Sequence, residues 1–299
     1  MRNAGGVEPA DPRVPDSWHG LLGAIRARGR AGRVYVLGGP DTGKSTLCRW
    51  LWTALAGEAG TALVSCDPGQ AEIGPPGAVA MTAGSPEDPD PPLLRLVGSV
   101  SPPGHLLQTL SGVLRLAGEA EDRGAEGVVC DSSGFATGDV AREFQHQLID
   151  TLLPRHLVAI QNEEELEPIL RCFQGPSPEV HRLEVSGAVR PRSREERRQR
   201  RRERFRRYFQ GSGPLELDLD GLGLHGHVPD LEKRDELRGL LVAPCDRDGF
   251  ALCLALVRRM WQRDGRVELL APPFSPRRVA TLQFGSLRLE PDGREMEGS

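Results

Sequence analysis

One local pattern between residues 33 and 55 constrains the fold more than any other feature of the chain. Residues 33–37 (RVYVL) form a short apolar run, and residues 45–55 carry leucines at every fourth position, as an amphipathic helix does. Between them, residues 38–45 (GGPDTGKS) match the pattern GxxxxGK[ST]. The order strand, tight loop, helix predicts a phosphate-binding loop at the carboxyl end of a sheet strand.

Each residue type in this loop has a chemical reason. Glycines let successive backbone N–H groups converge on phosphate oxygens, and the following helix adds its positive dipole end. We expect Lys44 to bridge the β- and γ-phosphates and the Ser45 hydroxyl to coordinate Mg²⁺. The predicted cofactors are therefore ATP or GTP and Mg²⁺. The predicted nucleotide-binding residues are Gly38, Gly39, Pro40, Asp41, Thr42, Gly43, Lys44, Ser45 and Thr46.

The rest of the first two thirds of the chain alternates between short apolar runs and helical segments. The runs at residues 61–66, 127–130 and 157–160 predict buried strands, and the segments near 104–123 and 139–153 predict helices. Strands and helices in alternation are typical of a parallel sheet covered on both faces. The sequence thus predicts the α/β class, with a P-loop NTPase parallel sheet flanked by helices.

The pattern changes after residue 211. Short alternating or apolar runs there predict strands and a small β-rich carboxyl-terminal domain; they lie at residues 215–224, 239–243, 250–257, 267–270 and 286–289. We expect a flexible tail over residues 1–16, a nucleotide-binding domain over 17–211 that begins with a short helix, and the β-rich domain over 212–299.

The net charge of −4 hides a strongly uneven distribution. Residues 190–207 hold 11 Arg against 3 Glu, a balance of +8, which leaves −12 for the remainder. One basic segment on an acidic body is a candidate anion-binding element. Residues 192–209 favour a helix, on which Arg194, Arg198 and Arg202 follow one face and Arg197, Arg201 and Arg204 the adjoining stripe. A solvated helix or a nonspecific nucleic-acid patch is the alternative.

Composition also indicates the cellular compartment and the redox state of the cysteines. No run approaches the roughly 18–20 apolar residues of a membrane span, and the six cysteines occur singly without a CxxC pair. Reduced, mostly buried thiols and a cytoplasmic protein without a membrane partner are the corresponding expectations.

Two predicted strands end in an aspartate, where ligands bind in such sheets. Asp67 is followed by a Pro-Gly turn that directs Gln70 toward the same edge, and Asp131 opens the sequence DSSG. Either acid suits a proton acceptor or a Mg²⁺ ligand, so the predicted metal set is Ser45, Asp67 and Asp131. The DxxG at 131–134 also occurs in GTPases, but the chain lacks an NKxD motif for guanine.

Four motifs in order carry a resemblance. Residues 38–46, the segment Asp67-Pro-Gly-Gln70 with Pro-Pro-Gly at 75–77, residues 132–135 and residues 192–209 together resemble the polynucleotide 5′-hydroxyl kinase family. That family includes the kinase subunit of the pre-mRNA cleavage machinery and the kinase of pre-ribosomal RNA processing. The resemblance covers residues 17–210 and implies a P-loop kinase domain with an arginine-rich lid helix.

The resemblance also implies roles. Asp67 would activate a 5′-hydroxyl on RNA or DNA, and Arg197 and Arg201 would match the family's RxxxR lid; with Lys44 these form the implied catalytic set. The implied substrate-binding residues are Gln70, Ser132, Gly134, Phe135 and Arg192, of which residues 132–135 resemble the family's TxG[W] clasp. Ser132 and Phe135 replace the usual Thr and Trp, and Ser65 stands where many members have an acid.

The expected function is therefore transfer of the γ-phosphate of a nucleoside triphosphate to the 5′-hydroxyl end of RNA or DNA. Two alternatives remain at this point. One is an NTP-binding scaffold protein of an RNA-processing complex without turnover, and the other is an assembly GTPase.

Overall fold

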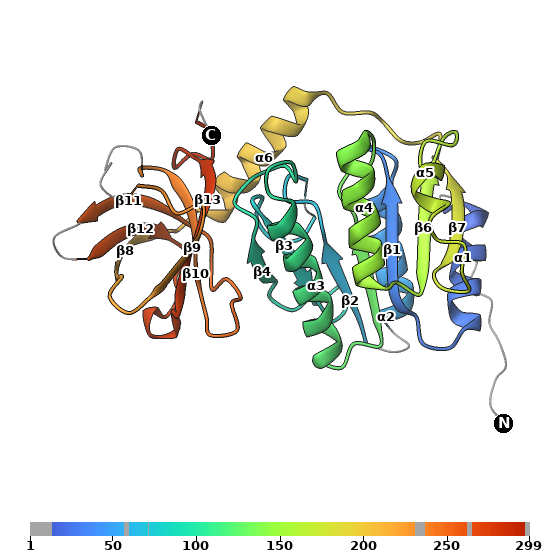
Figure 1. The fold of residues 1–299 in the computed structure, drawn as a ribbon, viewed down its shortest axis with the longest axis horizontal. Helices are drawn as coiled ribbons and strands as arrows, with labels where there is room; N and C mark the ends of the chain where they lie inside the picture. Colours follow the sequence, from blue (N-terminus) through green and yellow to red (C-terminus); the bar gives the residue numbers. More distant parts are fainter. Residues whose placement is uncertain (1–13, 57–59, 71, 231–236, 262–264, 297–299) are drawn as a thin grey trace.

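Two β-sheets joined by a long helix make up the protein (Figure 1). The computed structural model describes residues 14–56, 60–70, 72–230, 237–261 and 265–296. The first sheet has seven strands in the order β4-β3-β2-β5-β1-β6-β7, and the second has six in the order β8-β12-β11-β10-β13-β9. Most of the predicted tail, residues 1–16, falls outside the described residues, and the first helix begins at Asp16.

The first sheet follows the predicted strand–helix alternation. Its strands are β1 (Gly32–Gly38), β2 (Thr61–Ser65), β3 (Ala78–Thr82), β4 (Leu93–Leu96), β5 (Gly127–Asp131), β6 (His156–Gln161) and β7 (Glu179–Glu184). The helices are α1 (Asp16–Ala27), α2 (Lys44–Ala56), α3 (Leu106–Asp122), α4 (Asp139–Leu152) and α5 (Glu167–Leu170).

Both faces of this sheet are covered, as the continuous apolar runs in its central strands require. Leucines of α1 and α2, such as Leu22 and Leu51, pack in one cluster with Val34 and Val36 of β1. Side chains of α3, α4 and α5 pack in a second cluster with Tyr35 on the opposite face. The central strands are therefore held rigidly, and their carboxyl ends form a fixed edge.

The second sheet supplies its own core. Its strands are β8 (Gly213–Asp218), β9 (Gly223–Gly226), β10 (Leu240–Cys245), β11 (Ala255–Trp261), β12 (Arg266–Ala271) and β13 (Thr281–Arg288). Neighbours pair antiparallel except β13 and β9, and a short 3₁₀ helix, η3 (Pro276–Arg278), precedes β13. Val242 and Phe284 pack in this core, and along β12 the buried Val267 and Leu269 alternate with more exposed residues.

The structure differs from the predicted elements at several places. Five strands of the first sheet are parallel, and β3 and β4 are antiparallel additions. The sequence pattern did not predict β3, β4 or the parallel edge strand β7. The predicted strand at 250–257 begins only at Ala255, and the run at 215–224 divides into parts of two strands around a turn. Mostly buried loop residues at 250–254 imitate the apolar pattern of a strand, whereas the partly exposed Leu219 and Leu222 carry the alternation through the turn.

The helix α6 (Arg194–Tyr208) joins the two sheets, and its last turns are part of the core between them. Phe205 and Phe209 are buried in a cluster that includes Ala78 and Leu96 of the first sheet and Leu241 of the second. The backbones also meet directly, because the carbonyl of Gly98 accepts hydrogen bonds from the N–H groups of residues 286 and 287. The two sheets therefore share one interface rather than a loose linker.

No helix among the described residues has the length and apolar character needed to cross a membrane.

The contact at Gly98 gives a sharp stability test. Gly98 has φ of 83°, and a Cβ there would lie 2.4 Å from the Cα of Gly285. Gly104 has nearly the same φ, 80°, but nothing lies within 4 Å of its Cβ position. We expect Gly104→Ala to cost about 1 kcal/mol, from backbone strain alone, and Gly98→Ala to cost roughly 3 kcal/mol or more because it separates the sheets.

Urea unfolding followed by circular dichroism measures both variants. Equal losses for Gly98→Ala and Gly104→Ala would contradict the proposed close packing of the two sheets.

Candidate active site

The phosphate loop lies at the carboxyl end of β1, the position that the sequence predicted. β1 ends at Gly38 and α2 begins at Lys44, so the loop between them leads into the amino terminus of α2, the end with the positive dipole. The Thr42 hydroxyl donates a 3.1 Å hydrogen bond to the carbonyl of Gly39, which ties the loop to itself. The loop is thus preformed for an anion.

The Lys44 side chain lies folded back onto this loop. It is only 7% exposed, and its Nζ donates a 2.5 Å hydrogen bond to the Gly39 carbonyl. Burial lowers the pKa of Lys44, while the nearby carboxylates of Asp131 and Asp67 oppose that shift. The Lys44 ammonium therefore lies between the Gly39 carbonyl and two carboxylates of the site.

Asp131 at the end of β5 is buried beside the start of α2. Burial raises its pKa to about 6, against the opposing effects of a Ser45 hydrogen bond and the Lys44 charge. Its Oδ1 has no hydrogen-bond partner among the described residues. An unpartnered, buried carboxylate oxygen next to a hydroxyl is a donor set that suits Mg²⁺, so Ser45 and Asp131 fit the predicted metal position.

Asp67 follows β2 at the same edge of the sheet. Its Oδ1 accepts hydrogen bonds from the backbone N–H groups of Gly69, at 2.7 Å, and Gln70, at 3.0 Å. These contacts fix the carboxylate in the turn, and Asp67 and Gln70 both line the same cavity as Lys44. The two strand-end acids therefore meet as predicted, Asp131 deep in the site and Asp67 nearer its opening.

Residues 132–135 pass directly over the phosphate loop. A Cβ on Gly134 would lie 3.1 Å from backbone atoms of Pro40, so only glycine lets the two segments touch without displacement. The carbonyl of Phe135 accepts a 2.8 Å hydrogen bond from Gln145 of α4, whose amide oxygen in turn accepts one from the Tyr35 hydroxyl at 2.6 Å. This buried chain fixes the segment relative to β1.

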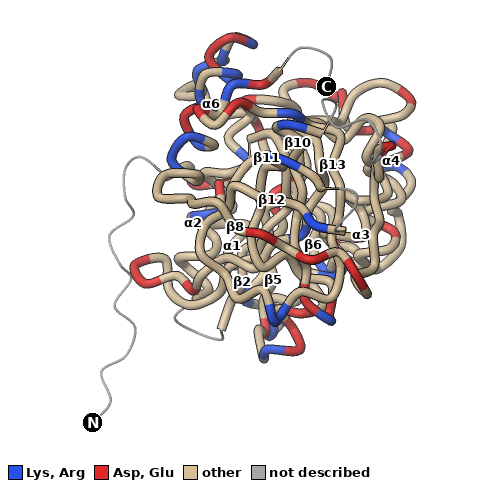
Figure 2. The backbone as a smooth tube through the Cα atoms, turned by 90° about the vertical axis from the view of Figure 1, so that its left-hand side faces the viewer, with Lys and Arg blue, Asp and Glu red and all other residues tan. Residues whose placement is uncertain are grey.

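The arginine helix α6 begins beside the phosphate loop (Figure 1), and its dense charge stands out along the backbone (Figure 2). Ser193 and Glu196 form a reciprocal capping box that sets its start. The Asp41 carboxylate accepts hydrogen bonds from the Arg192 backbone N–H at 2.9 Å and from Arg197 at 2.5 Å. Asp41 is therefore both a loop residue and the anchor of α6.

These contacts decide the charge state of Asp41. Burial raises the pKa of its carboxyl, but the hydrogen bonds from Arg192 and Arg197 outweigh burial and leave the pKa below its ordinary value. Asp41 has φ of 52°, in the left-handed region, which for an aspartate is tolerated best where the side chain is held by hydrogen bonds.

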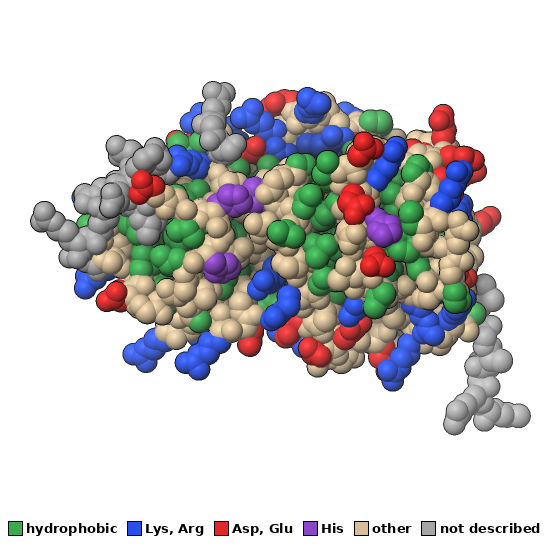
Figure 3. Space-filling view, viewed as in Figure 1, with side chains coloured by type: hydrophobic (Ala, Val, Ile, Leu, Met, Phe, Trp, Pro, Cys, Tyr) green, Lys and Arg blue, Asp and Glu red, His purple; other side chains and the backbone are tan. Residues whose placement is uncertain are grey.

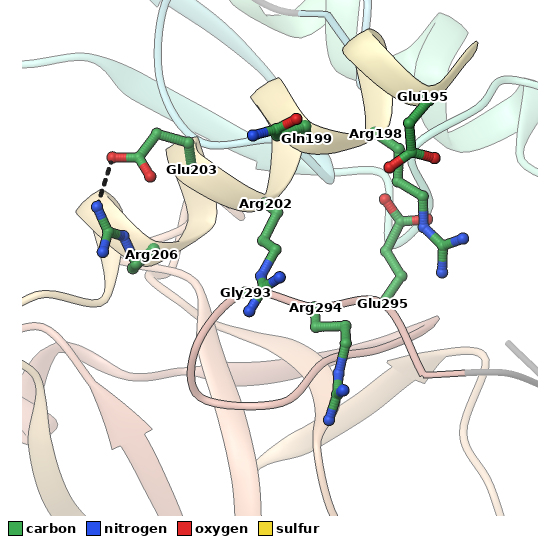
Figure 4. Close-up of a pocket in the computed structure, with 9 residues that line it drawn as sticks. All are labelled: Glu195, Arg198, Gln199, Arg202, Glu203, Arg206, Gly293, Arg294 and Glu295. Atoms are coloured by element: carbon green, nitrogen blue, oxygen red, sulfur yellow. Dashed lines mark hydrogen bonds and ion pairs between the residues drawn. The ribbon is translucent and has the colours of Figure 1, made fainter.

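The other arginines of α6 are divided between two sides. Arg201 pairs with Glu295 at 2.8 Å, Arg202 pairs with Asp292, and Arg204 donates to the carbonyl of Gly74 at 3.0 Å. Figure 4 shows the side of α6 that faces the carboxyl-terminal loop. A pocket of about 550 Å³ lies there, and glutamates in its lining neutralise part of the arginine charge. Much of the segment therefore attaches the helix to the body. Arg197, by contrast, faces the phosphate loop.

One cavity of about 1390 Å³ is lined by the predicted site residues except Gly38 and Gly39. The loop residues 40–46 line it together with Asp67, Gln70, Asp131, residues 132–135, Arg192, Arg197 and Arg201. Basic side chains gather along the edge of the molecule above it (Figure 3). Lining residues that the sequence did not predict include Trp18, residues 100–102, Ser186 and residues 188–190. Trp18 fits the apolar spacing of α1, so nothing in the sequence distinguished it from a core residue.

A known protein family matches the part of the chain that contains this site. Residues 38–211 match the family described as mRNA cleavage and polyadenylation factor CLP1 P-loop, which is more than half of the chain. The chain belongs to this family. The match begins at the first glycine of the phosphate loop and ends just after α6, so it contains every predicted site residue.

Individual relatives of this CLP1-family chain come from archaea and eukaryotes. A polyribonucleotide 5′-hydroxyl-kinase of Pyrococcus furiosus is 25% identical, with 95% of each chain covered. Another of Methanocaldococcus jannaschii is 28% identical, with 95% of this chain and 94% of the relative covered. A CLP1 homolog of Nematostella vectensis is 31% identical over 60% of this chain and 45% of its own.

Solved structures agree on the fold. A complex of wild-type Clp1p with Pcf11p matches with a TM-score of 0.67 at 16% identity, covering 90% of this chain and 77% of that one. A second structure, which describes an extended interface between Pcf11p and Clp1p, matches with a TM-score of 0.68 at 17% identity, covering 90% and 78%. Both sheets of the CLP1-family chain therefore have counterparts in known structures.

The Asp41 contacts predict how firmly α6 is held. Asp41→Ala removes the acceptor for Arg192 and Arg197, so the start of the helix should open more often. Loss of a charged hydrogen bond of about 1.5 kcal/mol corresponds to on the order of tenfold more opening. Limited trypsin digestion should therefore cut among the α6 arginines on the order of tenfold faster. Glu195→Ala, an exposed change on the same helix, is the control, and equal cutting of both variants would contradict the anchor.

Proposed function

We propose that this protein is a polynucleotide 5′-hydroxyl kinase that transfers the γ-phosphate of a nucleoside triphosphate to the 5′-hydroxyl end of an RNA or DNA strand. The observation that carries the proposal is the shared cavity, in which the phosphate loop, Asp67 and Arg197 face one space. At about 1390 Å³ it exceeds the roughly 300–1,000 Å³ of ordinary ligand pockets. That volume suits a donor nucleotide and an acceptor end together.

The donor half of the proposal rests on residues 38–46. The loop N–H groups and the α2 dipole would hold the phosphates, and Lys44 would exchange its Gly39 carbonyl contact for the β- and γ-phosphates. Ser45 and Asp131 would hold Mg²⁺, whose chemistry when bound is to neutralise charge on the phosphate oxygens. The donor is ATP or GTP, because the proposed contacts of the phosphate loop and α2 are all to phosphates and do not distinguish one base from the other.

The acceptor half rests on Asp67. Its carboxylate is fixed by two backbone hydrogen bonds, so it is oriented before a substrate arrives. We assign it the proton of the attacking 5′-hydroxyl, with Gln70 beside it as an acceptor-side contact. Ser132, Gly134 and Phe135 would close the opposite wall over the phosphate loop.

The proposed role of α6 as a lid rests on Arg197. Its guanidinium lies at the loop through Asp41, and a bound triphosphate would offer it a stronger anion. Arg192 would contact substrate phosphate at the helix start. Arg201 would join the transfer site only by leaving Glu295, so we assign the larger transfer role to Arg197. The archaeal relatives named polyribonucleotide 5′-hydroxyl-kinases support RNA as the first acceptor to test.

Label transfer tests the proposal directly. Protein, Mg²⁺ and ATP or GTP labelled in the γ-phosphate are incubated with 5′-hydroxyl oligonucleotides of RNA and of DNA. Label should appear on the 5′ end of the oligonucleotide. Asp67→Asn should lower the rate by roughly 10²–10⁴-fold, the contribution of a general base.

Asp139→Asn makes the same chemical change on an exposed aspartate of α4 and should leave the rate unchanged. NTP binding without label on either polymer would overturn the kinase proposal and favour the scaffold. Release of free phosphate alone would favour a nucleoside triphosphatase.

The lid assignment has its own test. Arg197→Ala should lower kcat by roughly 10²–10³-fold through loss of a charge-stabilising group, with a smaller change in NTP binding. Arg206→Ala removes an arginine from the same helix that pairs with Glu203 at 3.0 Å, and it should keep near-normal kcat. Single-turnover transfer and isothermal titration with nucleotide separate the two effects. An unchanged kcat in Arg197→Ala would refute the assignment.

A further inference from the structure

Three side chains with metal-binding groups meet at the amino-terminal ends of β6 and β7. His156 begins β6, Glu179 begins β7 and lies opposite it, and His181 follows two residues later. Alternation along strands places all three on one face of the sheet. It is the face of α1 and α2, because Val158, two residues after His156, packs in their cluster.

The distances among these groups suit a single ion. His156 Nδ1 lies 3.0 Å from His181 Nε2 and 3.9 Å from Glu179 Oε2, and His181 Nε2 lies 4.0 Å from Glu179 Oε1. Two atoms bound to one zinc-like ion at about 2.1 Å can be no more than about 4.2 Å apart. The two Glu179 distances are to different oxygens, but one ligand atom from each residue can be chosen so that all three lie within 4.8 Å of one another. Small side-chain shifts would therefore let one ion contact every group.

The surroundings of the cluster keep both imidazoles ready to bind. The His156 side chain is fully buried, and His181 and Glu179 are partly exposed, so an ion has a route from solvent. Burial lowers the pKa of His156 to about 4 and also lowers the pKa of His181. Neutral imidazoles retain a lone pair, which is the form that binds a metal.

The donor atoms decide which kind of ion fits this cluster. Arg28 lies 2.8 Å from Glu179 Oε2, which leaves Oε1 for a ligand bond and orients the carboxylate as ligating carboxylates require. Arg28 and Arg155 both lie close enough to act on the charge of His156. Two imidazole nitrogens and one carboxylate disfavour Mg²⁺ and Ca²⁺, which need several oxygens, and favour a transition metal that binds imidazole. The nearby arginine charges weaken the binding of any cation and do not select among them.

We propose that His156, Glu179 and His181 bind one zinc-class transition-metal ion, with water as the fourth ligand. The ion clamps β7, an edge strand with a single sheet neighbour, to β6. β6 runs from His156 to Gln161, so at about 3.3 Å per residue the ion lies roughly 16 Å from the edge that holds the phosphate loop. The site is therefore separate from the Mg²⁺ position, and it does not depend on the proposed kinase activity.

Cobalt titration of the full-length protein tests this proposal, because Co²⁺ replaces zinc and four-coordinate Co²⁺ absorbs strongly in the visible range. All proteins carry Cys172→Ser to remove the exposed thiol, are stripped with chelator, and are titrated in excess Mg²⁺ to occupy oxygen sites. The parent should bind one equivalent of Co²⁺ with that absorption, and one equivalent of Zn²⁺ should displace it. Zn²⁺ should also raise the melting temperature.

His181→Gln and Glu179→Gln should each lose the absorption and the rise in melting temperature, while circular dichroism and NTP binding stay normal. His19→Gln, which changes an exposed histidine on α1, should bind as the parent does. No uptake by the folded parent, or uptake unchanged in both cluster variants, would overturn the proposal. Glu179→Gln guards against a misfolded His181→Gln, because Glu179 is the more exposed of the two.

Discussion

The Asp41 carboxylate is the contact on which the arrangement of the site depends. It belongs to the phosphate loop, yet it accepts hydrogen bonds from Arg192 and Arg197 at the start of α6. Without an anion at this point, the positive start of α6 would face the positive end of α2 and Lys44 across the cavity. The aspartate offsets this repulsion, and it holds the helix where a triphosphate would later compete for the same guanidinium.

The far end of α6 explains why that helix can be held at its start by so few contacts. Phe205 and Phe209 are buried between the two sheets, and Arg201 and Arg202 pair with acids of the carboxyl-terminal loop. Apolar burial of this kind is worth about 1.5–3 kcal/mol for each large side chain. Movement at the cavity is therefore expected at the start of the helix, with the last turns as the fixed point.

Local patterns predicted the centre of the fold well, because each of its elements is specified by nearby residues. The loop at 38–45 and the strand-end acids Asp67 and Asp131 follow from periodicity and from the rule that parallel strands end at one edge. β3 and β4 were missed because their burial comes partly from the second sheet, a contact between residues far apart in sequence. The division of the α6 arginines between different partners was also not predictable. Helical spacing shows which residues share a face, but it does not show which residues pack against that face.

The ion-pair partners of the α6 arginines, which the sequence does not show, bear most directly on function. The sequence distinguishes 11 arginines only by position, whereas the structure gives several of them different partners: Asp41 for Arg197, Glu295 for Arg201 and a backbone carbonyl for Arg204. An arginine already paired in a half-buried setting must lose that pairing before it can stabilise a transferring phosphate. Arg197 loses a partner that belongs to the phosphate site itself, and Arg201 loses one that holds the two sheets together. The same motif therefore contains one arginine held at the phosphate loop and one held at the carboxyl-terminal loop.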